Sequence, residues 1–195
     1  MKPSLLEAET LMLTHTLGLP MRRHCYAVGA SMRHYARMRG EPEELWATVG
    51  VLHDFDYEAH PEDHPHWGLR HLEGLEADPV IIRAIASHCD STGVPRESAL
   101  ERHLFACDEL SGFVMAVAFV RPSKSIHEVE VSSVLKKLKT PAFAARVHRD
   151  EVQAGAEAIG LPIEEHIANV ITALRADAAR LGLDGMASSS MSKDQ

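Results

Sequence analysis

Apolar side chains recur at intervals of three or four residues along most of this chain, and proline and glycine mark where the pattern starts and stops. This spacing places apolar residues on one face of an α-helix. In the segment 19–40, Pro20 lies near the start and Gly40 closes the run, as is typical of a helix. Asp78 and Pro79 open another segment as N-cap and first helical residue. No sustained alternation of apolar and polar residues predicts a β-sheet, so we predict an all-α fold.

A chain of 195 residues is long enough to bury one core. We therefore expect a single-domain helical bundle over residues 1–183, with additional helices at its N- and C-terminal ends. The Ser-rich end, residues 184–195, is expected to be disordered. The main predicted helices cover the segments 19–40, 41–54, 77–90, 98–120, 125–139, 150–160 and 162–182.

The composition is that of a soluble globular protein, with 45% apolar and 25% charged residues. A net charge of −8 and the lack of a basic block argue against a nucleic-acid partner. The first 18 residues resemble neither a secretory signal nor a membrane-spanning helix, so we expect no membrane partner. Three widely separated cysteines predict no disulfide framework. A cytoplasmic location fits these features best. Histidine is the unusual residue, with 13 copies scattered along the chain.

Several titratable residues fall on the apolar faces of the predicted helices. His24, His53 and His88 each align with apolar residues three or four positions away, and Asp108 lies amid a strongly apolar segment. Burying a polar group without a partner costs about 2–7 kcal/mol, and burying a charge costs more. One shared cation would satisfy all of these residues together. Imidazole and carboxylate ligands suit Mn²⁺, Fe²⁺, Zn²⁺, Ni²⁺ or Mg²⁺.

Each of these residues also has a simpler interpretation. A single inward-facing histidine is more often a hydrogen-bonded core residue than a metal ligand, and a single aspartate is often a cap or an ion-pair partner. His53 and Asp54 together would also suit a helix end, where the helix dipole favours a histidine. The conjunction of the residues on separate helices, rather than any one of them, predicts the metal site.

Each of the three cysteines adjoins a candidate ligand, which raises the possibility of thiolate ligands. Adjacent side chains on a helix diverge by about 100°, so thiols beside the ligands should point away from the metal. The C-x₂-C spacing that is typical of zinc sites is also absent. We interpret Cys25, Cys89 and Cys107 as small apolar residues near the site.

The order of these residues along the chain resembles the HD-domain superfamily of metal-dependent phosphohydrolases. An isolated His24 precedes the doublet His53-Asp54, then His64 and His88, and finally Asp108. The likeness spans about residues 20–125 and extends to small bacterial HD proteins described as predicted hydrolases. The stretches of this chain that resemble theirs, in the same order, are VLHDFDYE, HPHWG, AIASH, DELSGF and VRPSKS.

The resemblance implies a helical bundle of the HD-domain type and a set of ligands. His24, His53, Asp54 and Asp108 match the ligands of the first metal. His64 and His88 match the additional ligands of members that bind two metals, in which the aspartate of the doublet bridges the ions. His64 is also expected to start a helix. The number of ions, one or two, and their identity stay open.

The resemblance further implies metal-activated water that hydrolyses a small phosphomonoester or phosphodiester, with Asp54 as a catalytic residue and nucleotides among the candidate substrates. The GYP signature of cyclic-dinucleotide phosphodiesterases is absent, so we do not expect a cyclic dinucleotide as substrate. Two alternatives remain. Diiron oxygenases such as myo-inositol oxygenase use the same ligand pattern, and a non-catalytic HD module would sense a nucleotide.

Charged residues near the motifs supply candidates for substrate binding. Arg121 and Lys124 follow the Asp108 segment and are predicted to bind the phosphate, Arg121 by a bidentate contact and Lys124 as a point charge, with a solvated turn as the alternative. Arg22 and Arg23 are weaker candidates for the same task. We interpret Asp56 and Glu58 as loop charges, although they would alternatively orient ligand histidines. His60, Asp63 and His66 are interpreted as surface residues at the mouth of the site.

Overall fold

The computed structural model describes residues 3–185 and shows an all-α protein, as predicted. Within that range no strand forms, and an isolated bridge between Ser125 and Asp184 is the only β-type pairing. The predicted disordered tail lies mostly in residues 186–195, outside the described residues. The helices are α1 Leu5–His15, α2 Leu19–Arg39, α3 Glu43–Leu52, α4 His66–Gly74, α5 Pro79–His88, α6 Ala99–Phe119, α7 Val131–Leu138, α8 Arg149–Ala158, α9 Ile163–Ala176 and α10 Ala178–Leu181, with short 3₁₀ turns η1 Asp90–Thr92 and η2 Ile126–Glu128.

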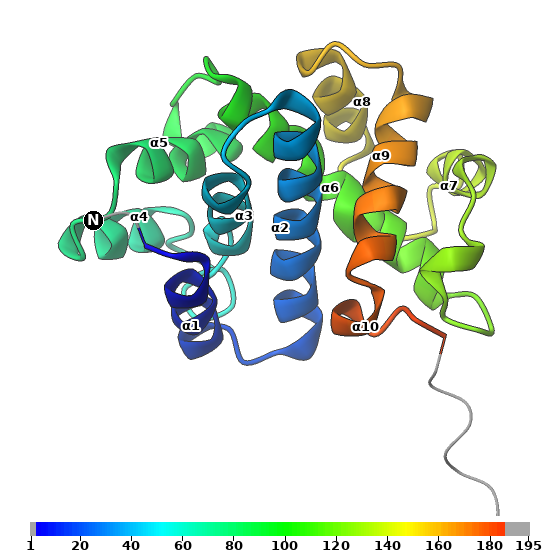
Figure 1. Ribbon diagram of the computed structural model, residues 1–195, viewed down its shortest axis with the longest axis horizontal. Coiled ribbons are helices and arrows are strands. Elements are labelled where there is room, and N and C mark those ends of the chain that lie inside the picture. Colours follow the sequence, from blue (N-terminus) through cyan, green and yellow to red (C-terminus); the bar gives the residue numbers. More distant parts are fainter. Residues whose placement is uncertain (1–2, 186–195) are drawn as a thin grey trace, which may run out of the picture.

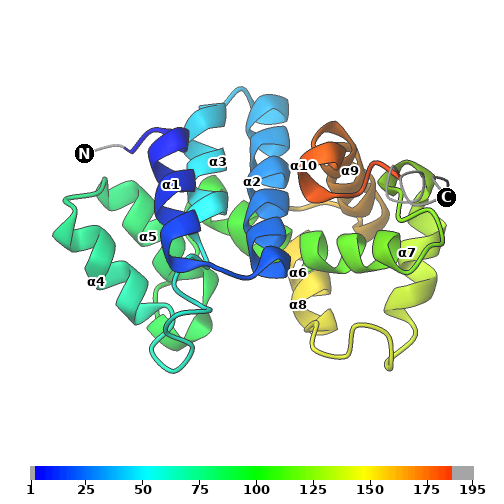
Figure 2. The same cartoon turned by 90° about the horizontal axis from the view of Figure 1, so that it is seen from below.

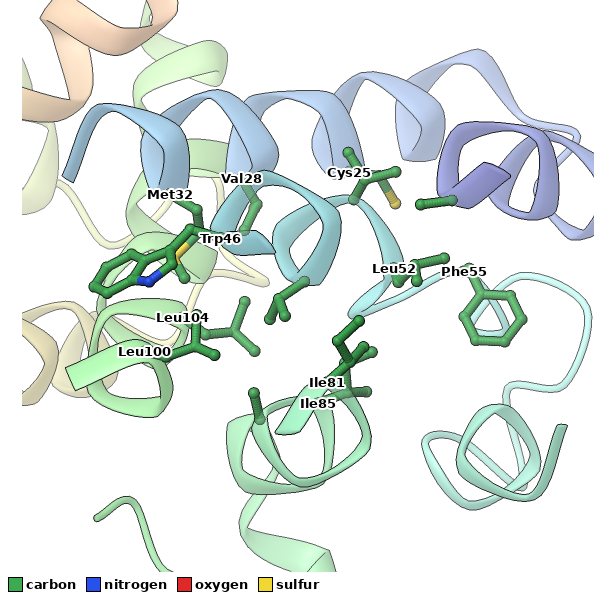
Figure 3. Close-up of a cluster of buried hydrophobic side chains, with 14 of the residues drawn as sticks. Cys25, Val28, Met32, Trp46, Leu52, Phe55, Ile81, Ile85, Leu100 and Leu104 are labelled. Atoms are coloured by element: carbon green, nitrogen blue, oxygen red, sulfur yellow. The ribbon is translucent and has the colours of Figure 1, made fainter. Parts of the chain in front are cut away.

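The two longest helices, α2 and α6, connect two groups of helices (Figures 1 and 2). On one side, α1, α3, α4 and α5 pack around a core that includes Trp46, Leu52 and Ile85 (Figure 3). On the other side, the second half of α6 packs with α7, α8, α9 and α10 around Phe113 and Ile167. Because both long helices run through both cores, residues in the middle of α6 lie between the two groups.

Local signals mark several helix boundaries. Gly40 takes a left-handed conformation at the end of α2, with φ of 70°, and Asp78 caps α5 by accepting a hydrogen bond from the backbone N–H of Val80. Ser98 and Glu101 form a capping box at the start of α6. No helix among the described residues combines the length and the apolar character needed to cross a membrane.

Three predicted boundaries differ from the structure. The segment 125–139 starts as the 3₁₀ turn η2, because the Ser125 side chain accepts a hydrogen bond from the backbone of His127, and α7 begins only at Val131. The segment 162–182 breaks at Asp177 into α9 and α10. The helix expected to start at His64 starts at His66, after a cis His64–Pro65 bond.

Candidate metal centre

Four side chains from three separate elements converge between the two helix groups. His24 comes from α2, His53 and Asp54 follow the end of α3, and Asp108 comes from the middle of α6. The Nε2 atoms of His24 and His53 lie 3.1 Å apart, and each lies within 3.3 Å of Asp108 Oδ1. Asp54 Oδ2 completes this first group at 3.7 Å from His24 Nε2 and 3.4 Å from His53 Nε2.

A second group shares Asp54 with the first. Asp54 Oδ1 lies 3.3 Å from His64 Nε2 and 3.4 Å from His88 Nε2. His64 lies in the loop before α4, and His88 is the last residue of α5. The two oxygens of Asp54 therefore face different sets of donors. Such an arrangement would suit a carboxylate shared by two ions, which is the role that the resemblance implies for Asp54.

Backbone carbonyls fix the orientation of two of these imidazoles. His53 Nδ1 lies 2.8 Å from the carbonyl oxygen of Gly50, and His88 Nδ1 lies 2.5 Å from that of Ile85. A carbonyl can only accept, so we assign the proton of each ring to Nδ1. The Nε2 lone pairs of both histidines then point into the group.

Asp56 holds the third imidazole and corrects our interpretation of that residue as a loop charge. Its side chain is 1% exposed; it accepts hydrogen bonds from His64 Nδ1 at 2.7 Å and from the backbone N–H of Gly68 at 2.8 Å. Asp56 thus orients His64, which was the alternative. Glu58 accepts from the backbone N–H groups of Leu17 and Gly18 at 2.6 and 2.7 Å, and so caps the start of α2.

The donor set fits divalent cations. Ligands about 2.1 Å from a shared ion lie about 3.0 Å apart at a right angle and about 3.4 Å apart at the tetrahedral angle, which matches the separations of 3.0–3.7 Å in both groups. Neutral imidazoles whose Nε2 lone pairs face ionised carboxylates repel them unless a cation lies between. Two ions, one in each group, would satisfy all six side chains.

The electrostatics of the protein alone show the same demand for positive charge. Burial disfavours a charged His53, yet the carboxylates of Asp54 and Asp108 raise its pKa well above the usual value. Burial likewise opposes ionisation of Asp54 and Asp108, yet the neighbouring histidines hold the pKa of both carboxyl groups well below the usual range. Both carboxyl groups are therefore ionised, and positive charge beside them stabilises that form.

The cysteines lie near the centre but outside both donor groups. Cys25 and Cys107 are fully buried. Burial raises the pKa of the Cys25 thiol to about 12 and also raises that of Cys107. Cys89 is partly exposed beside His88, with its Sγ 3.0 Å from Ser91 Oγ. Cys25 and Cys107 agree with our interpretation of the cysteines as small apolar residues near the site, whereas Cys89 lines the cavity.

A cavity of about 570 Å³ opens directly onto both groups. Its other walls come from the end of α5, the middle of α6, and the segment that leads into α8. Arg96 and Arg146 supply its arginine side chains, and Asp90, Glu109 and Glu151 supply carboxylates outside the two donor groups. A volume of this size suits a small organic ligand.

Arg121 and Lys124 are not brought to the centre. About 16 Å of helix separates Asp108 from the end of α6 at Phe119, and both residues come after that end. Arg121 donates a hydrogen bond to Ser133 Oγ in α7 at 3.0 Å, and Lys124 is exposed. Neither lines the cavity. The nearness of these residues to Asp108 in sequence is misleading, because a helix carries the chain away from the site.

Arg22 and Arg23 do not line the cavity either. Arg22 Nε donates to the carbonyl of Thr16 at 2.6 Å, and the Arg23 guanidinium lies 5.3 Å from the ring centroid of Phe119. Adjacent side chains on α2 diverge, so neighbours of His24 face other parts of the protein. Sequence adjacency to a ligand again fails to predict a place in the cavity.

The remaining charged residues of the loop before α4 lie away from the donors. His66 is exposed, and Asp63 forms an ion pair with Arg70. His60 is only partly exposed, and its ring stacks on Trp67 with centroids 3.9 Å apart. His60 is therefore better described as a packing residue than as a surface residue.

Sequence reasoning missed Arg96, Arg146 and a cluster of Glu109, His148 and Glu151 on the cavity wall. Arg96 is well held, because its guanidinium stacks on Phe105 at 3.7 Å from the ring centroid and donates to the carbonyl oxygen of His88 at 3.1 Å. No local pattern signals these residues. Only the chain path after α7 brings residues 146–151 to the cavity.

The sequence model of the HD-domain family matches residues 21–112, a range that contains all six donor residues. This segment is an HD domain. HD domains form a superfamily of metal-dependent hydrolases, and the all-α fold and the two donor groups agree with that membership. Neither the curated proteins nor the solved structures include a significant match to the chain. The HD match ends in the middle of α6, so the cavity wall from 146 to 151 lies outside it.

Proposed function

We propose that this protein is a metal-dependent phosphohydrolase that acts on a small phosphomonoester or phosphodiester. The observation that carries the proposal is Asp54, whose two oxygens face two separate donor groups at the wall of a cavity of about 570 Å³. Divalent ions bound there would lower the pKa of a coordinated water toward neutrality and offset negative charge on phosphoryl oxygens. Asp54, His53 and His24 hold fixed positions because each element that carries them packs in the core.

Arg96 and Arg146 take the phosphate-binding role that sequence reasoning had given to Arg121 and Lys124. The stacking of Arg96 on Phe105 fixes the plane of its guanidinium, which favours directed contacts with phosphate oxygens. Its present ion-pair partner, Asp90, has a side chain that is 89% exposed. A substrate phosphate can displace such an exposed carboxylate, because a surface ion pair contributes only about 0–1 kcal/mol.

Metal content and phosphate release together test this function. The protein purified without added metal is analysed for bound transition metals and Mg²⁺, and is then screened for phosphate release from nucleotides, sugar phosphates and aryl phosphates. We expect Asp54→Ala to lose bound metal and phosphate release together, since it removes the one carboxylate common to both groups. Asp63→Ala is the matched control, because this aspartate lies on the same loop but pairs with Arg70 outside the donor groups.

The screen also separates the alternative functions. Two irons per chain, oxygen uptake and no phosphate release would favour a diiron oxygenase. Nucleotide binding without turnover would favour a sensing module. Unchanged metal content in Asp54→Ala would show that the site assignment itself is wrong.

A further inference from the structure

The wall of the cavity that faces the HD domain carries one imidazole outside both donor groups. His148 precedes α8 and lines the cavity together with Arg146 and Glu151. Figure 2 shows α8 and the segment that leads into it on one side of α2, and the loop between α3 and α4 on the other. His148 and members of both donor groups line the same cavity, so a substrate bound there would have access to both.

Two carboxylates hold the His148 ring by the same nitrogen. Its Nδ1 lies 3.1 Å from Glu109 Oε1 and 3.3 Å from Glu151 Oε1. The backbone N–H of His148 also donates to Glu109 Oε2 at 3.3 Å, so Glu109 positions both the ring and its backbone. Glu109 directly follows Asp108 on α6, but the two side chains belong to different groups of the cavity wall. The His148 side chain is 65% exposed, and with Nδ1 turned to the two carboxylates, Nε2 is the ring nitrogen that remains for a ligand.

We propose that His148 is the general acid that protonates the leaving-group oxygen; this inference rests on the proposed function. A water oxygen forms a bond to phosphorus and gives its proton to solvent. The bond from phosphorus to the leaving oxygen breaks, and its electron pair takes the proton from His148 Nε2. Solvent water then reprotonates the imidazole. Ester and water are thereby converted to phosphate and alcohol, with no other reactant.

The need for such an acid depends on the leaving group. An alkoxide is a strong base that leaves slowly unless it is protonated in the transition state, whereas 4-nitrophenolate is a weak base that leaves unaided. A positioned general acid contributes about 10²-fold to 10⁴-fold to rate. If His148 has this role, its loss will slow the hydrolysis of alkyl esters far more than that of aryl esters. Loss of a residue that only shapes the cavity will slow the hydrolysis of both to the same extent.

The experiment compares 4-nitrophenyl phosphate with glycerol phosphate in the metal-loaded protein. His148→Gln is expected to lower kcat on glycerol phosphate about 10²-fold to 10³-fold, and on 4-nitrophenyl phosphate by less than about 10-fold. Glu109→Gln should show the same dependence on leaving group with a smaller loss. Arg146→Gln is the comparison variant, and we expect it to lower kcat/KM for both substrates by a similar factor.

Two further readouts separate chemistry from binding. Calorimetric titration with inorganic phosphate should give the same affinity for His148→Gln as for the unaltered protein, and bound metal should be equal in both. Equal losses on the two esters, or no loss on glycerol phosphate, would overturn the role of His148 while leaving the phosphohydrolase function in place. An unaltered protein that holds metal but hydrolyses neither ester nor any member of the phosphate panel would overturn both.

Discussion

At the scale of single residues, the loop after His53 shows how two carboxylates two positions apart take different tasks. Asp56 is buried and orients His64, whereas Glu58 is exposed and caps α2. Both were interpreted from sequence as loop charges, because a loop has no periodicity that tells an inward side chain from an outward one. The convergence of the candidate ligands was predictable, since these residues follow helical spacing or the doublet of the HD pattern.

Asp56→Asn should selectively lower the metal affinity of the second donor group. Asparagine would place an amide where two N–H donors, from His64 and Gly68, now meet one carboxylate. Loss of such a supporting hydrogen bond typically costs 10-fold to 100-fold in metal affinity. We expect a loss of about that size for the ion of the second donor group, measured by competitive metal titration. In the control Glu58→Gln, the affinity of this ion should stay unchanged; equal affinities in all three proteins would contradict the role of Asp56.

At the scale of elements, the crossing of α2 and α3 sets the distance between His24 and His53. Gly29 and Gly50 face each other there, and a Cβ built on Gly50 would lie 2.8 Å from the Cα of Gly29. The two backbones are therefore in near contact. Glycine on helix faces is visible in the sequence, but its pairing partner is not, because it depends on how two helices cross.

Gly50→Ala should test this crossing. The added methyl group has to push α3 away from α2, and such overpacking costs about 1–3 kcal/mol of unfolding free energy. Metal affinity should fall as well, because the push separates two ligands of the first group. Gly74→Ala is the matched control, since a Cβ there meets nothing within 4 Å. Urea unfolding and metal titration of both variants measure the effects, and an equally stable Gly50→Ala would rule out the close contact.

Some helix boundaries can be predicted from the neighbouring sequence, and others cannot. Helix starts such as Asp78-Pro79 and Ser98 were predictable, because the residue that caps the helix directly precedes it in the sequence. The break at Asp177 was not, since no glycine or proline marks it. It redirects the chain so that Leu181 and Leu183 bury themselves in the second core. The place of His148 on the cavity wall depends on the same kind of long-range packing.

At the scale of the whole molecule, buried histidines with no place in either donor group tie the two helix groups together. His166 of α9 is fully buried; its Nδ1 lies 2.7 Å from the Tyr35 hydroxyl of α2, and its Nε2 lies 2.8 Å from the carbonyl oxygen of Ala106 in α6. His103 is buried between Tyr35 and Trp46. These two fit the simpler interpretation of an inward histidine as a hydrogen-bonded core residue. The histidines that form the centre differ from them in facing carboxylates.

Burial lowers the pKa of both His166 and His103 to about 4, so acid should destabilise the fold. An unfolded histidine titrates near 6.5, and the unfolded chain therefore binds protons between pH 6.5 and 4 that the folded protein does not. Stability is complete above about pH 6.5 and falls toward pH 4, by about 1.4 kcal/mol per pH unit for each such group. Metal-free protein unfolded in urea at pH 6 and pH 5 should show this loss. His166→Gln should flatten the slope by about 1 kcal/mol per pH unit. Tyr35→Phe, which keeps the imidazole, should lower stability at both pH values without changing the slope; an unaltered slope in His166→Gln would mean that this histidine is already protonated in the fold.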